Sequence, residues 1–160
     1  MKRRLVAAIA CRNQGTRLYG KAIQNIDVEN EISILDNIIY CLKTIKQIDA
    51  IVLGISDNKD NEVYKDVAKK HKISFILGEE KNVLGRLIKC GEHESASDIF
   101  RITSECPFLY YEAVEETWER YNHKNLDAIF MDYLIDGIGF EIISLDALKL
   151  SNEKGSEKHR

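Results

Sequence analysis

The stretch LVAAIACRNQGTRLYGKA, residues 5–22, joins a short apolar run to a loop that carries three cations. The run from Leu5 to Ala10 has the length and composition of a strand buried in a sheet. A plain turn after it would need only a Gly or an Asn, but this loop contains Arg12, Arg17 and Lys21. Open parallel sheets bind ligands beyond the carboxyl ends of their strands, so we expect the loop to lie at a ligand site.

Strand and helix patterns alternate along most of the chain. Apolar runs typical of buried strands recur at residues 51–56, 73–77 and 99–103. Apolar residues at three- and four-residue steps predict helices between them, in the ranges 32–45, 63–68, 83–94 and 113–121. Strands separated by helices imply a mostly parallel sheet covered on both faces, which is an α/β fold.

The pattern changes after Leu126. Residues 128–131 and 140–143 have the composition of later strands, which we expect as an antiparallel addition at the sheet edge. The last ten residues, SNEKGSEKHR, contain no aliphatic or aromatic side chain and predict an exposed or frayed end. The expected organisation is therefore one domain over residues 1–150 and a polar tail over 151–160.

Composition narrows the class of protein. With 160 residues, 44% hydrophobic and 31% charged, the chain can form one soluble domain. A net charge of -3 with interspersed signs argues against nucleic-acid binding. The first apolar run is too short for a signal peptide, and none could cross a bilayer, so we expect a cytoplasmic protein that does not act on membranes. The four cysteines are far apart and are expected to be free thiols; they are Cys11, Cys41, Cys90 and Cys106.

The loop nearly matches a phosphate-binding P-loop. Gly15 to Ala22 fits G-x-x-x-x-G-K-[ST] except that Ala22 replaces the hydroxyl residue that holds magnesium, and the match begins four residues after the strand. One alternative is an extended phosphate-gripping loop, in which glycines let backbone amides approach oxygens and the three cations supply counter-charge. The other is a solvated polar turn. The residues of the loop alone leave both open.

Several blocks in order resemble one known family. The segment ACRNQGTRLYGKAI resembles the A-R-M-G-S-[ST]-R-L-P-G-K signature of the cytidylyltransferases related to the spore coat polysaccharide biosynthesis protein SpsF, which are similar to the synthetases of CMP-activated acidic sugars. The segments GEEKNVLGRLIKC and DIFRITSECPFL resemble the family's G-x-E-x-x-V-L-x-R and R-I-T-x-D-C-P-L blocks. IVLGISDNKDNEV and DGIGFEIISLDAL resemble its early strand and turn and its P-x-G-L-D-x-E-V-F-S stretch.

The resemblance implies a Rossmann-like nucleotidyltransferase of the GT-A type, a three-layer sandwich around a mostly parallel sheet. It implies a CTP- and Mg²⁺-dependent enzyme that transfers CMP to a sugar or related acceptor and releases pyrophosphate, in surface polysaccharide or glycoconjugate synthesis. Arg12 and Lys21 would be catalytic, Glu105 would hold magnesium, and Glu141 would lie near the acceptor. The implied nucleotide contacts are Ala8, Ile9, Ala10, Arg12, Arg17, Lys21, Gly85, Arg86, Arg101 and Thr103.

The sequence also departs from the family pattern. Glu105 stands in place of an aspartate that the family uses for magnesium, and Gly139 stands in place of another acidic residue. In the first loop Asn13, Gln14, Gly15 and Tyr19 differ from the signature, whereas its cations are kept. Similar proteins continue with an R-E-H-V-T-like segment, so we expect that acceptor or homodimer contacts could lie in elements beyond this chain.

Other interpretations stay open on sequence grounds. A catalytically degenerate nucleotide- or sugar-binding domain would keep the loop and lose turnover, whereas a metal-dependent glycosyltransferase normally carries a D-x-D motif that this chain lacks. Arg86 could be only a surface charge, Thr103 could simply end a strand, and Glu105 could cap the following turn. Asp57 fits a turn better than a ligand site. The residues His71, His93 and His123 show no metal-ligand spacing.

Overall fold

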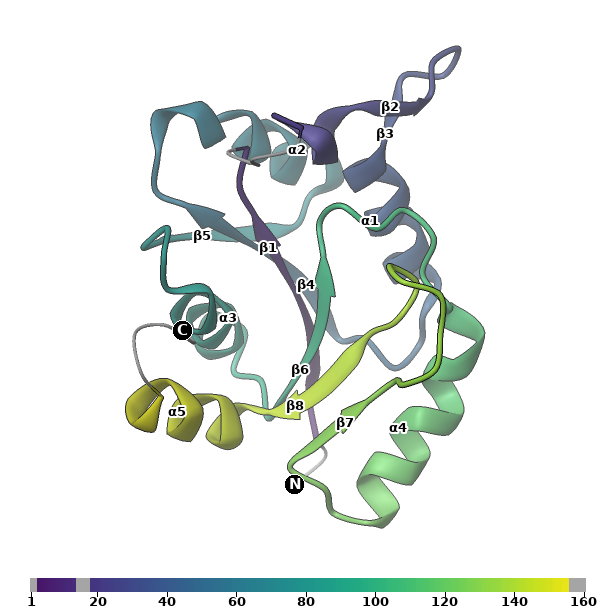
Figure 1. Cartoon of the computed structure of the whole chain (residues 1–160), viewed down its shortest axis with the longest axis vertical. Coiled ribbons are helices and arrows are strands. Elements are labelled where there is room, and N and C mark those ends of the chain that lie inside the picture. The colour runs from purple at the N-terminus through teal and green to yellow at the C-terminus, as the bar shows by residue number, and fades with distance from the viewer. Residues whose placement is uncertain (1–2, 14–17, 156–160) are drawn as a thin grey trace.

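A six-stranded sheet forms the centre of the molecule in the computed structural model, which describes residues 3–13 and 18–155 (Figure 1). Its strand order is β5-β4-β1-β6-β8-β7. The neighbours β5, β4, β1 and β6 pair in parallel, whereas β8 pairs antiparallel with both β6 and β7. The strand bounds are β1 Leu5–Cys11, β4 Ala50–Ser56, β5 Ser74–Gly78, β6 Asp98–Thr103, β7 Ala128–Phe130 and β8 Glu141–Ser144. The predicted α/β fold and the antiparallel addition are thus confirmed.

Helices cover both faces of this sheet and make it a three-layer sandwich. Helices α1 (Ile34–Thr44), α2 (Val63–His71) and α4 (Val114–His123) contribute to one hydrophobic core, and α3 (Val83–His93) and α5 (Leu145–Lys154) to the other. Side chains alternate along β1 because successive residues of a strand point to opposite faces. Odd-numbered residues from Leu5 to Cys11 enter the first core, and Val6 and Ala8 enter the second.

Helix α1 is shorter than its apolar pattern predicted. Ser33 caps its first turn, because the Ser33 side chain accepts from the Asp36 backbone while the Asp36 side chain accepts from the Ser33 backbone. Ile32, which the prediction placed in the helix, instead belongs to the two-residue strand β3 (Ile32–Ser33), and Ile45 is the residue that ends the helix. The apolar spacing therefore located the helix but not its ends.

One hairpin and one helix were absent from the sequence-based prediction. Strand β3 pairs with β2 (Asn25–Asp27) in a small separate hairpin. Helix α5 is capped by Ser144 and runs to Lys154, through four residues that we expected to fray. Ser151, Glu153 and Lys154 are exposed as expected, but they are helical. Three 3-10 helices complete the described elements, at Lys21–Ile23, Lys59–Asn61 and Tyr111–Ala113.

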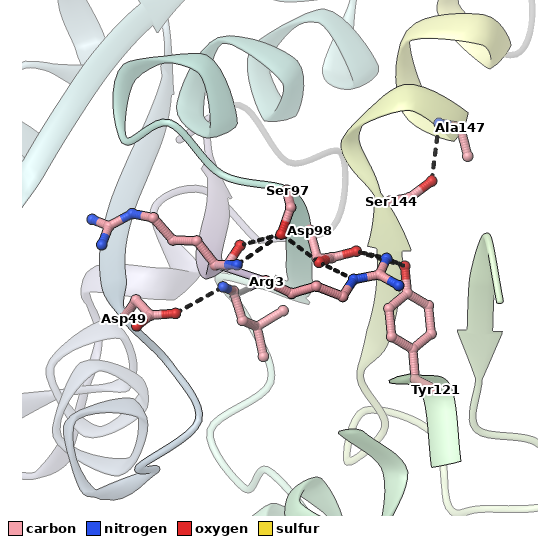
Figure 2. Close-up of polar contacts among 9 residues, drawn as sticks. Arg3, Asp49, Ser97, Asp98, Tyr121, Ser144 and Ala147 are labelled. Atoms are coloured by element: carbon pink, nitrogen blue, oxygen red, sulfur yellow. Dashed lines mark hydrogen bonds and ion pairs between the residues drawn. The ribbon is translucent and has the colours of Figure 1, made fainter. Parts of the chain in front are cut away.

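A buried carboxylate holds the amino ends of β1 and β6 together (Figure 2). Asp98 is fully buried and accepts hydrogen bonds from Arg3, from the Tyr121 hydroxyl at 2.7 Å and from the Ser97 hydroxyl at 2.7 Å. The Arg3 guanidinium also lies 4.7 Å from the centre of the Tyr121 ring, a cation-π distance. This cluster ties the start of β1 to β6 and α4 at the end of the sheet away from the cation-bearing loop.

All four cysteines are free, as predicted. Cys11 and Cys90 are fully buried, and this burial raises the pKa of both thiols, to about 12 for Cys90. They therefore behave as small apolar side chains rather than nucleophiles. Among the described residues, no helix is both long enough and apolar enough to span a bilayer.

Candidate functional site

A cavity of ≈ 410 Å³ lies at the carboxyl ends of β1 and β6, where the fold class places its ligand sites. The loop after β1, the start of α3 and the loop after β6 contribute its walls. Four cations and one carboxylate line it among the residues described. Its lining residues are Ala10, Arg12, Lys21, Val83, Arg86, Arg101, Ile102, Thr103, Ser104, Glu105 and Cys106.

Asn13 fixes the base of the cation-bearing loop. Its backbone N–H donates to the Asn61 side chain at 2.7 Å, and its own side chain donates to the Asp60 carbonyl, so the loop after β1 is tied to the loop after β4. The Gly20 N–H then donates to the Asn13 carbonyl at 3.0 Å, which closes the loop. Gly20 has φ 62°, a conformation that favours glycine. These bonds bring Arg12 and Lys21 to the same cavity.

The segment after Lys21 is not that of a P-loop. Lys21 begins a 3-10 helix of three residues, and Ala22 is buried in the core. A P-loop instead leads into a helix whose first turn carries a hydroxyl for magnesium. The described residues therefore argue against a P-loop, and the extended phosphate-gripping loop stays a prediction beside the solvated polar turn. Gln14, Gly15, Thr16 and Arg17 lie outside the described residues.

Arg86 is buried at the cavity wall, so the interpretation of Arg86 as a surface charge is wrong. Its side chain is 2% exposed and lies against Gly54 and Gly78. A Cβ at Gly78 would come within 2.7 Å of Arg86 Cγ, so glycine is required there for the arginine to pack on the sheet. The guanidinium donates to the carbonyls of Glu79 at 2.5 Å and Glu80 at 2.7 Å.

The Arg86 guanidinium lacks a carboxylate partner within the described part of the chain. Within residues 3–13 and 18–155 the guanidinium makes no ion pair, and its Nε has no hydrogen-bond partner. Burial lowers the pKa of Arg86, because desolvation disfavours the charged form. An anion in the cavity would offset this cost, since an opposite charge nearby favours the charged form.

Arg101 forms an ion pair with Glu141 on the neighbouring strand of the sheet. The two residues are register partners in β6 and β8, and Arg101 Nη1 lies 2.6 Å from Glu141 Oε1. Arg101 lines the cavity already described and also a second one of ≈ 460 Å³ toward β7 and β8. Glu141, which the resemblance places near the acceptor, lines the second cavity and not the first.

Glu105 lines the cation-lined cavity. Within residues 3–13 and 18–155, its side chain makes no hydrogen bond or ion pair, so the interpretation of Glu105 as a turn cap gains no support. The turn is instead held by Thr103, whose hydroxyl lies 2.9 Å from Cys106 Sγ. Thr103 both ends β6 and lines the cavity.

The described residues contain no group of three or more metal-ligating side chains arranged around one point. A single carboxylate still fits a Mg²⁺ site, because that ion is usually held by one or two protein carboxylates together with substrate phosphates and waters. Glu105 is the carboxylate that the cation-lined cavity offers for such a site.

Other predicted site residues lie outside the lining of that cavity. Ala8 and Ile9 are fully buried in the middle of β1. Gly85 has a structural reason for being glycine, because the Asn82 side chain caps α3 on the Gly85 N–H at 2.7 Å and lies 2.9 Å from where a Cβ would be. Asp57 lies in the turn after β4, as expected.

Sequence reasoning did not find Asn13 as an anchor or the second cavity. Asn13 acts through Asn61, 48 residues away, and no local pattern marks such a pair. Much of the wall of the second cavity is built by residues 132–137, between β7 and β8, which carry no strand or helix pattern. The sequence feature that could have indicated this cavity is its pair of aspartates, Asp132 and Asp136.

No protein-family model matches this chain. The uncharacterized protein MJ1063 of Methanocaldococcus jannaschii is 24% identical over 157 residues, which cover 98% of this chain and 63% of that protein. The chain therefore spans less than two thirds of this curated relative.

Two solved structures share the fold. A cytidylyltransferase from Leptospira borgpetersenii serovar Hardjo-bovis superimposes with a TM-score of 0.80 at 20% identity, covering 98% of this chain and 66% of that one. A CMP:2-keto-3-deoxy-manno-octonic acid synthetase in complex with CTP gives a TM-score of 0.76 at 11% identity, covering 96% and 79%. At these identities the likeness shows that this chain shares the three-layer fold of the two enzymes.

Proposed function

We propose that this protein is a cytidylyltransferase that transfers CMP from CTP to a sugar or related acceptor and releases pyrophosphate. One observation carries the proposal: Arg12, Lys21 and Arg86 line a single cavity and make no ion pair among the described residues. Unpaired cations that converge at the carboxyl ends of parallel strands form a site for a polyanion. A nucleoside triphosphate is such a polyanion.

The choice of CTP rests on likeness. The sequence blocks around Arg12, Arg86 and Arg101 resemble those of SpsF-related cytidylyltransferases. One structural neighbour is called a cytidylyltransferase, and another was solved with CTP bound. The finer role in surface polysaccharide or glycoconjugate synthesis is part of the proposal and comes from the resemblance alone.

Phosphoryl transfer needs positioning and charge neutralisation more than covalent help from the protein. Arg12 and Lys21 would bind the triphosphate, together with Arg17. Arg86, which α3 packs against the sheet, would contact the triphosphate at the cavity wall, and its buried charge would be stabilised by the anion. Thr103 and Arg101, at the end of β6, would contact the nucleotide on the side of the second cavity.

Glu105 would hold Mg²⁺ against the triphosphate. Bound Mg²⁺ would supply neutralisation of the charge that develops on the phosphate oxygens. The carboxylate suits that role because Glu105 lines the cavity and its side chain has no hydrogen-bond or ion-pair partner in the part of the chain that the structure describes. Its longer side chain, compared with aspartate, changes the reach of the ligand by one methylene.

A panel of CTP, UTP, ATP and GTP, each with Mg²⁺, tests the proposal by thermal shift. Binding to the native state stabilises it by mass action, so CTP should raise the melting temperature more than the other three nucleotides. Equal shifts for all four nucleotides would contradict the choice of cytidine. The absence of any shift would contradict nucleotide binding itself.

A binding domain without turnover is the second candidate function. The observations that favour it are Glu105 and Gly139, which replace acidic residues of the resembling family. Pyrophosphate release from CTP, measured with acceptor sugars present, separates the two. CTP binding without pyrophosphate release would support the binding domain.

A further inference from the structure

A second cavity adjoins the proposed CTP site. It has a volume of ≈ 460 Å³ and shares four lining residues with the cation-lined cavity, namely Arg101, Ile102, Thr103 and Cys106. Its other walls come from the segment that follows β7 and from the start of β8. A molecule in this cavity would therefore lie directly beside a nucleotide in the first.

The charges around this second cavity have the opposite sign to those around the first. Asp132, Asp136 and Glu141 line it, and its only cation among the described residues is Arg101. Its charge is already neutralised by an ion pair, because Arg101 lies 2.6 Å from the Glu141 carboxylate. Asp132 and Asp136 are exposed and have no ion-pair partner in the described part of the chain. A negatively charged guest would meet two uncompensated carboxylates.

Gly139 leaves additional room in the same cavity. A Cβ at this position would come no closer than 3.9 Å to its neighbours, the side chain and carbonyl of Met131, so an alanine would fit. The absence of a side chain at Gly139 is thus not required by packing. It widens the cavity beside Phe140 and Glu141.

We propose that the second cavity takes the acceptor, and that this acceptor is a sugar or polyol without an anionic group, either uncharged or bearing an amine. The proposal rests on the proposed cytidylyltransferase function. A carboxylate or phosphate on the acceptor would be repelled by Asp132 and Asp136, whereas hydroxyl groups can donate hydrogen bonds to these carboxylates and an ammonium group would be attracted.

The nucleophile in this scheme is a hydroxyl group. Its oxygen forms a bond to the α phosphorus of CTP, and the bond from that phosphorus to the oxygen bridging to the β phosphorus breaks. Pyrophosphate leaves with the electron pair of the broken bond, and the hydroxyl proton is released to water. The product is the CMP ester of the acceptor.

Saturation-transfer NMR on the full chain, loaded with CTP and Mg²⁺ at pH 6.5, provides the test. The probes are glucose, sorbitol, glucosamine, glucuronate and glucose 1-phosphate, so glucose and its derivatives differ mainly in charge. We expect glucose, sorbitol or glucosamine to bind about fivefold or more tightly than the two anions, as electrostatic repulsion near a protein surface implies. Tighter binding of glucuronate or glucose 1-phosphate overturns the proposal, and so does the absence of binding by every probe.

Charge-removing variants sharpen the test. In Asp132→Asn/Asp136→Asn the preference for uncharged over anionic probes should fall toward onefold, whereas Asp66→Asn, on the exposed surface of α2, should keep it. An unchanged preference in the double variant would show that these aspartates do not set it. CTP binding measured in the same samples separates the two proposals. If the native protein does not bind CTP, the cytidylyltransferase function is contradicted. If it binds CTP but prefers an anionic acceptor, only this inference is contradicted.

Discussion

Arg86 is buried against two glycines and donates to two backbone carbonyls, and no described carboxylate neutralises it. Burying an unpaired cation costs free energy, which is the reason its pKa is lowered. The two carbonyl hydrogen bonds offset part of that cost but leave the charge in place. A cation kept at such a cost beside Arg12 and Lys21 is best explained by an anion that binds there.

Lys21→Ala should weaken CTP binding without unfolding the protein. Each charge-assisted phosphate contact is worth about 1.5 to 3 kcal/mol, so the dissociation constant should rise roughly 10- to 150-fold. Isothermal titration calorimetry measures the affinity, and urea unfolding measures the stability, which should change by about 0.5 kcal/mol or less. Lys69→Ala, on the exposed surface of α2, is the matched control and should change neither. Lost folding with retained CTP affinity would make Lys21 a structural residue.

Glu105→Gln should abolish Mg²⁺-dependent pyrophosphate release. Metal-free CTP binding should stay intact or become tighter, because removal of the carboxylate also removes a repulsion of the triphosphate. Glu105→Asp should keep or raise the rate, since it restores the residue of the resembling family. Turnover that survives Glu105→Gln unchanged would exclude Glu105 as the metal ligand.

Among the contacts between helices, a buried carboxylate joins α1 to α2. Asp36, in the first turn of α1, lies 2.5 Å from His71 Nε2 at the end of α2, and Ser33 and Lys70 also donate to it. Burial alone would raise the pKa of Asp36, but the hydrogen bonds from His71, Ser33 and Lys70 outweigh it and lower that pKa to about 2. The carboxylate is therefore a stabilising group only while it is ionised.

This contact predicts a pH dependence of stability. The folded-state pKa of Asp36 is depressed, so its contribution is complete above the unfolded-state value of about 3.9 and is lost as the pH falls toward 2. The free energy of unfolding, measured with urea between pH 5 and pH 2.5, should fall more steeply in the native protein than in Asp36→Asn. Parallel curves for the two proteins would exclude Asp36 as a source of the acid sensitivity. Asp66→Asn, at an exposed pair, should follow the native curve.

Most of the strands and helices, but not all of them, could be predicted from the sequence alone. Apolar runs located the first four parallel strands, because a buried strand needs continuous apolar side chains, and the helix spacing located α1 to α4. The hairpin β2–β3 escaped prediction because its first strand has three residues and only Ile26 among them is apolar. Helix α5 escaped because its polar residues from Ser151 onward hid the pattern begun by Leu145 and Leu148.

At the scale of the whole molecule, the sheet brings together cations that are far apart in sequence. The loop after β1 supplies Arg12 and Lys21, α3 supplies Arg86 and β6 supplies Arg101. The resemblance named these residues individually, and the parallel order of β4, β1 and β6 explains why they meet. Their surroundings could not be predicted, because the Asn13 to Asn61 contact and the Arg101 to Glu141 pair depend on how distant segments pack.

We propose that this convergence of charges binds CTP for nucleotidyl transfer, and a structure of the protein with CTP and Mg²⁺ is the sharpest test. We expect a triphosphate in the ≈ 410 Å³ cavity in contact with Arg12, Lys21 and Arg86. We also expect Mg²⁺ at about 2.0 to 2.1 Å from a Glu105 oxygen. CTP bound elsewhere, or a Glu105 carboxylate turned away from bound CTP and Mg²⁺, would contradict the proposed function.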